Sequence, residues 1–140
     1  MARSGTAETL GIEAEDGGPL ALSAAVSGGL PVAALDRLAR EMAPGDAGFV
    51  HRLVPRATLA RRRGGSARLS PQEGAKVARL AAIWTFARDV WGGDEAAREF
   101  LFRPHMLLHG RPPVDLVLES EFGGRLVENT LGRLKYGTGV

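Results

Sequence analysis

The sequence has no cysteine among its 140 residues, which excludes disulfides and cysteine-based metal or redox chemistry. It also lacks an apolar run long enough to span a bilayer. Its first residues do not show the basic start and apolar core of a secretory signal. Together these absences predict a soluble protein of the cytoplasm, without a membrane partner.

Acidic residues are missing between Ala47 and Gln72, although the net charge of the whole chain is only +2. The arginines of this stretch are Arg52, Arg56, Arg61, Arg62, Arg63 and Arg68. Basic charge gathered in one segment favours a polyanionic partner. The alternative is a solvated surface in a protein whose usual base is arginine, since lysine occurs only as Lys76 and Lys135.

Strand patterns are absent too, because apolar and polar residues do not alternate and β-branched residues are sparse. The strongest helix signal is Ser70-Pro71-Gln72-Glu73, a capping box that predicts a long helix ending near Trp91, before a Gly-Gly pair. Shorter helices are expected at 31–42, 49–54, 56–63, 94–101, 113–118 and 122–136, the last one stopping at Gly137. The predicted fold class is therefore all-α, with Trp84, Phe86 and Trp91 in its core.

Composition and punctuation divide the chain into three parts. Residues 1–29 are rich in Gly, Ala, Ser and acid and contain no aromatic residue, which predicts a flexible or loosely packed tail. Residues 30–68 have the helix lengths of a helix-turn-helix unit. Residues 69–140 form a helical C-terminal domain.

In a helix-turn-helix unit, the later helix enters the DNA major groove. The candidate DNA contacts are then Arg56, Thr58, Arg61, Arg62 and Arg63, because arginine forms bidentate bonds with guanine and with phosphate. The alternative is a basic, solvated helix that only packs an apolar residue against its neighbours. Spacing alone leaves both open.

Catalytic and metal-binding patterns are not found. His105 and His109 are four residues apart, but Pro104 and Gly110 disfavour a helix there, and no third ligand is evident. No nucleophile is paired with a base at a suitable spacing. The sequence predicts a protein that is not an enzyme and that needs no metal or cofactor.

The order of several motifs carries a family resemblance. They are Leu69-Ser70-Pro71-Gln72-Glu73, Ala87-Arg88-Asp89-Val90-Trp91-Gly92, Gly110-Arg111-Pro112-Pro113-Val114-Asp115-Leu116 and Leu131-Gly132-Arg133-Leu134-Lys135-Tyr136-Gly137. With the upstream Leu59-Ala60-Arg61-Arg62-Arg63, residues 30–140 resemble antitoxins of the Xre/MbcA/ParS type, and within them are most similar to ParS.

The resemblance implies a function. Such antitoxins pair with a RES-domain toxin, which consumes NAD⁺ by ADP-ribosyl transfer or by cleaving it, and they cover its NAD⁺ pocket with their C-terminal region. The Xre-like part often forms a homodimer and represses the shared operon by binding operator DNA. On this basis the expected toxin contacts are Leu131, Arg133, Leu134, Lys135, Tyr136, Gly137, Thr138, Gly139 and Val140.

Overall fold

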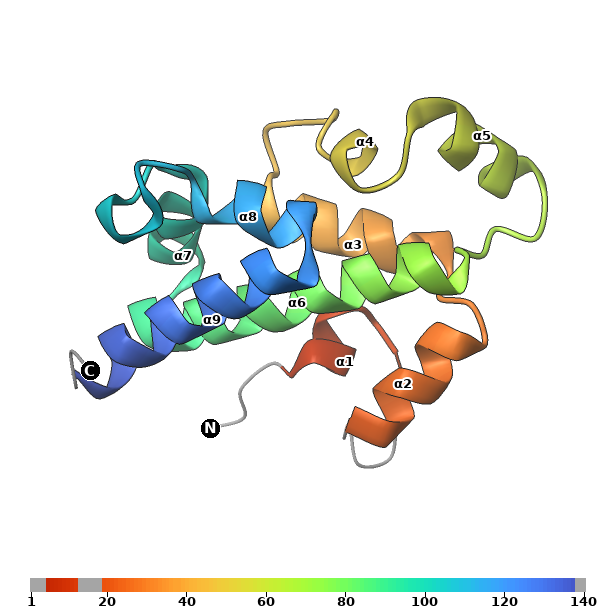
Figure 1. Ribbon diagram of the computed structural model, residues 1–140. Helices are drawn as coiled ribbons and strands as arrows, with labels where there is room; N and C mark the ends of the chain where they lie inside the picture. The colour runs from red at the N-terminus through yellow and green to blue at the C-terminus, as the bar shows by residue number, and fades with distance from the viewer. Residues whose placement is uncertain (1–4, 13–18, 138–140) are drawn as a thin grey trace. The chain divides into compact units, whose positions relative to one another are not determined.

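The computed structural model describes residues 5–12 and 19–137, and in these ranges its regular structure is helical apart from two isolated backbone bridges (Figure 1). The all-α prediction is confirmed. Within the same ranges, no helix combines the length and the apolar character needed to cross a membrane.

The chain divides into two compact units between Ala81 and Ala82. This boundary lies inside the long helix α6 (Pro71–Trp91), which runs without a break. Fully buried residues lie on both sides of the boundary, such as Val77 and Trp84.

The N-terminal unit consists of short helices and the first half of α6. Its helices are α1 (Thr6–Thr9), α2 (Pro19–Ser27), α3 (Val32–Met42), α4 (Val50–Leu53) and α5 (Arg56–Gly64). The segment 1–29, predicted as a loosely packed tail, thus contains two helices among its described residues. Ala7, Thr9 and Leu10 are buried there.

Two backbone hydrogen bonds join the residues around the start of α3 to the segment before α6. The N–H of Val32 donates to the carbonyl of Ala67 at 2.9 Å, and the N–H of Leu69 donates to the carbonyl of Leu30 at 2.7 Å. Ala67 adopts a left-handed conformation, with φ of 58°. These two hydrogen bonds bring the end of the predicted helix-turn-helix segment close to its beginning.

The capping box at the start of α6 forms as predicted. The Ser70 N–H donates to Oε1 of Glu73 at 2.8 Å, and the Glu73 N–H donates to Oγ of Ser70 at 3.1 Å. Two N–H groups without helical partners are thereby satisfied.

The C-terminal unit joins the second half of α6 to α7 (Asp94–Phe102), a 3-10 turn η1 (Met106–Leu108), α8 (Pro113–Glu119) and α9 (Glu121–Tyr136). Helix α7 packs on α8, and α8 packs on α9. The fully buried side chains of this unit include Trp84, Leu101, Val117, Val127 and Leu131.

A tight turn at Ser120 brings α8 and α9 into close contact. The Gly123 N–H donates to Oγ of Ser120 at 3.0 Å, which caps α9. A Cβ atom at Gly123 would overlap the carbonyl oxygen of Leu116 and lie 2.6 Å from its carbonyl carbon. Only glycine at this position allows the observed approach of α9 to α8.

Candidate functional site

The exposed end of α9 carries several of the predicted toxin contacts. Arg133, Leu134, Lys135, Tyr136 and Gly137 form its last turn and cap. Gly137 has φ of 62°, and its N–H donates to the carbonyl of Arg133 at 2.8 Å, which is the C-terminal cap that the sequence predicts.

The side chains of this turn differ in exposure. Tyr136 is 69% exposed and Leu134 is 40% exposed, so both are accessible to a partner. Leu131, which was predicted as a contact too, has a side chain that is fully buried inside the unit. Thr138, Gly139 and Val140, which were predicted as contacts as well, lie outside the described residues.

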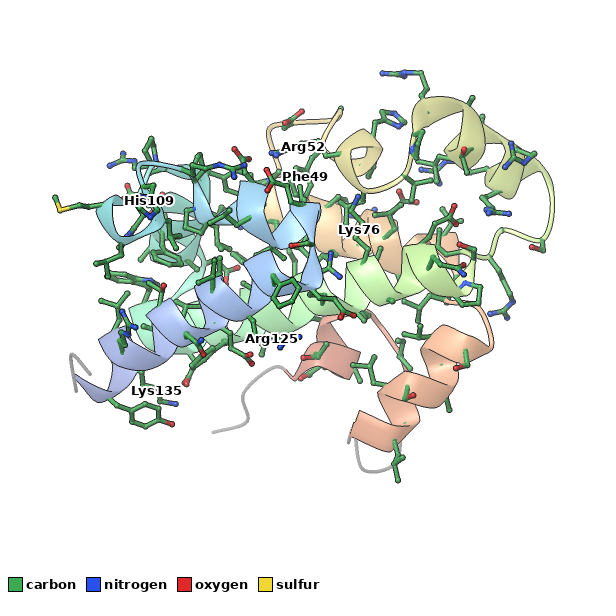
Figure 2. All side chains as sticks on the ribbon, in the orientation of Figure 1. Phe49, Arg52, Lys76, His109, Arg125 and Lys135 are labelled. Carbon is green, nitrogen blue, oxygen red and sulfur yellow. The ribbon has the colours of Figure 1, made fainter. Side chains whose placement is uncertain are left out.

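Lys135 lies near the C-terminal end of α9 (Figure 2). Its Nζ lies 2.6 Å from Oδ2 of Asp89 on α6. The same ammonium lies 5.9 Å from the ring centre of Phe86 and 5.6 Å from that of Tyr136. Its charge is therefore already engaged within the unit, by a carboxylate and by two aromatic rings.

Sequence reasoning missed an apolar surface at the α7–α8 connection. Trp91, expected in the core, is 41% exposed, and its ring centre lies 5.7 Å from that of Phe100. The two rings line a cavity of about 360 Å³ together with Pro104 and His105. Met106, in the adjoining turn, is 90% exposed. Three consecutive apolar residues, 106–108, in a loop that is otherwise polar were the available signal.

A second missed feature is the outer face of α9. Phe122 is 75% exposed and Leu126 is 52% exposed, one helical turn apart. The guanidinium of Arg125 lies 5.4 Å from the ring centre of Phe122. Exposed apolar residues in such number are typical of a surface that meets another protein.

In the N-terminal unit, α5 presents only part of the predicted DNA-binding set. Arg56 and Arg61 are exposed, and neither forms an ion pair within the part of the chain that the structure describes. Thr58 is half-buried.

Arg62 and Arg63 are held by carboxylates of their own unit. Arg62 makes two bonds of 3.1 Å to Glu73, and Arg63 makes bonds of 2.8 and 2.9 Å to Asp36. Each guanidinium thus has a bidentate partner within its own unit, and a contact of either one with DNA stays a prediction. Their role in the structure is to fix α5 against α6 and α3.

These ion pairs change the acidity of both carboxyls. The hydrogen bonds from Arg63 hold the pKa of Asp36 below its usual value. Burial works to raise the pKa of Glu73, but the bonds from Arg62 and Ser70 together outweigh it, and the pKa is lowered.

We expect this part of the stability to depend on pH. In the unfolded chain the carboxyls of Asp36 and Glu73 have pKa values of about 4, which are higher than their lowered pKa values in the folded protein. As the pH falls, the unfolded chain therefore binds protons first. The contribution is complete above about pH 5 and is lost as the pH falls through the folded-state pKa. Glu73→Gln keeps an oxygen for the Ser70 cap but loses the ion pair with Arg62. It should lower the free energy of unfolding at pH 7 by about 1 kcal/mol and reduce its acid dependence.

Urea unfolding between pH 3 and pH 7 measures this effect. Glu99→Gln is the matched control, since Glu99 forms an exposed pair with Arg103 at 3.6 Å and should change little. Equal effects of the two substitutions would contradict the assignment.

Two family models match parts of this chain. Residues 21–82 match the family model of the antitoxin Xre-like helix-turn-helix domain, and residues 86–137 match that of the antitoxin Xre/MbcA/ParS C-terminal toxin-binding domain. A curated relative, antitoxin Xre of Yersinia enterocolitica, is 35% identical over 85 residues. That match takes in 60% of this chain and 57% of the relative's length.

Fold and matches together define an all-helical protein in which a helix-turn-helix unit precedes a small helical domain of the toxin-binding class. In this order of domains the chain is similar to antitoxins of the Xre/MbcA/ParS type.

Proposed function

We propose that this chain is the antitoxin of a toxin–antitoxin pair and neutralises a RES-domain toxin that consumes NAD⁺. The observation that carries the proposal is the match of residues 86–137 to a toxin-binding domain, which ends at the cap of α9. The exposed end of that helix, with Arg133, Leu134 and Tyr136, is the surface that we assign to the toxin. In this role the chain binds in the cytoplasm, where NAD⁺ is consumed, and catalyses nothing itself.

The mechanism that we propose is occlusion of the NAD⁺ pocket. A pocket that binds a pyrophosphate presents hydrogen-bond donors, and backbone carbonyls that follow Tyr136 can accept from them. Tyr136 adds a rigid, amphipathic side chain of the kind that often anchors protein interfaces, here at the rim of the NAD⁺ pocket. Both would exclude NAD⁺ as long as the antitoxin stays bound.

Co-expression with the neighbouring gene tests the proposal. If that gene encodes the toxin, the two proteins should co-purify, and cells should lose NAD⁺ and stop growing only when this chain is omitted. Light scattering on the purified complex would show whether the antitoxin is a homodimer within it. A neighbour that is harmless alone and does not bind this chain would exclude the pairing.

Operator binding is a second proposed function, favoured by the helix-turn-helix match and by the exposed Arg56 and Arg61 on α5. If both arginines bind phosphates, Arg56→Ala/Arg61→Ala should weaken binding to the upstream DNA of the operon. The slope of log K against log salt should become shallower by about 0.9 for each phosphate that is no longer neutralised.

An electrophoretic shift or anisotropy titration at several salt concentrations measures this slope. Arg103→Ala/Arg125→Ala removes the same charge from the C-terminal unit and should leave DNA binding unchanged. Equal slopes for the wild type and the α5 variant would remove the assignment.

A further inference from the structure

The side chain of Lys135 links the last turn of α9 to α6. Nζ of Lys135 lies 2.6 Å from Oδ2 of Asp89, and the Lys135 side chain is only 34% exposed. The ammonium also contacts the ring faces of Phe86 and Tyr136, at 5.9 and 5.6 Å from the ring centres. Asp89 and Phe86 belong to α6, while Tyr136 is the next residue along α9.

This arrangement matters because helix ends fray. The last four carbonyl groups of a helix have no helical partner, and here the Gly137 N–H supplies a bond to one of them. A cation in the last turn also interacts favourably with the helix dipole and so stabilises the helix. The bond from Lys135 to Asp89 adds a lateral anchor, which restricts the orientations open to Tyr136.

We propose that Lys135 is a positioning residue for the toxin-binding surface and does not itself touch the toxin. Held by Asp89, its ammonium fixes the last turn of α9 and keeps the ring of Tyr136 in place beside it. The toxin is then contacted by Tyr136 and Arg133. The proposal rests on the function proposed above, and it reassigns a residue that the sequence placed among the toxin contacts.

Binding of the purified RES-domain toxin, measured by surface plasmon resonance, tests the role of Lys135. Lys135→Met keeps the aliphatic stem but removes the charge, and it should weaken binding about fivefold (~1 kcal/mol). Asp89→Asn should have a similar effect. Lys135→Arg, which keeps the positive charge, should retain most of the wild-type affinity. Arg103→Met, which removes an exposed cation from the same unit, is the control and should bind as the wild type does.

A double-mutant cycle distinguishes positioning from direct contact. If Lys135 acts through Tyr136, then Lys135→Met should cost almost nothing further in a Tyr136→Ala background. An equal loss of affinity in both backgrounds would mean that Lys135 contacts the toxin, and the proposal would be overturned.

A readout without toxin separates this inference from the proposed function. The ¹⁵N heteronuclear NOE of the Gly137 N–H should fall in Lys135→Met and Asp89→Asn while the melting temperature stays near that of the wild type. An unchanged NOE would overturn the positioning role. If the wild type fails to bind the toxin at all, the proposed function fails, and the NOE still decides whether Lys135 orders the turn.

Discussion

Removal of residues 136–140 should abolish neutralisation of the toxin without unfolding the protein. The truncated chain loses Tyr136, the most exposed large hydrophobic side chain of the last turn, and the segment that we assign to the NAD⁺ pocket. Buried aromatic anchors dominate many interfaces, so the affinity should drop at least about 100-fold, or ~2.7 kcal/mol.

Growth and NAD⁺ content of cells that co-express toxin and truncated antitoxin measure this loss of neutralisation. The melting temperature should change little, because the core of the unit is built from residues before position 136. Phe122→Ala removes another exposed aromatic side chain from α9 but leaves its end intact, so neutralisation should fall less than in the truncated chain. A truncated chain that still binds and fully inhibits the toxin would refute the occlusion mechanism.

Gly123→Ala should destabilise the C-terminal unit by about 3 kcal/mol or more, because the new Cβ meets backbone rather than a flexible side chain. The carbonyl group of Leu116 occupies the space that the methyl group needs. Helices α8 and α9 would have to separate, and the cap from Ser120 to Gly123 would break with them. Toxin binding should fall in parallel.

Gly132→Ala provides the matched control on the same helix. Nothing lies within 4 Å of a Cβ atom at Gly132. Since alanine is the better helix former, this substitution should stabilise the protein by about 0.5–1 kcal/mol. Urea unfolding of both variants measures the difference, and similar stabilities would contradict the close approach of α9 to α8.

Local signals in the sequence predicted much of the fold. The Ser70–Glu73 capping box and the Gly137 cap depend on residues at most four positions apart, so the sequence displays them directly. The limits of α6 and α9 follow from the same kind of signal. What the sequence could not show is how tightly two helices approach, as the position of Gly123 against Leu116 demonstrates.

The functional surfaces were harder to predict, because they depend on interactions between distant residues. In the sequence Arg62 and Arg63 look like free cations, but their partners Glu73 and Asp36 are 11 and 27 positions away. Leu126 and Leu131 are both apolar residues of α9, yet of these two only Leu131 is buried. Periodicity gives the direction of an apolar face, but the neighbouring helices decide how much of that face they cover.

The most direct test of the account is a titration of purified RES-domain toxin with this chain, with NAD⁺ consumption as the readout. We predict inhibition that is complete at a fixed ratio of the two proteins and that is relieved by raising the NAD⁺ concentration, since antitoxin and NAD⁺ compete for one pocket. NAD⁺ consumption that continues unchanged at saturating antitoxin would contradict it.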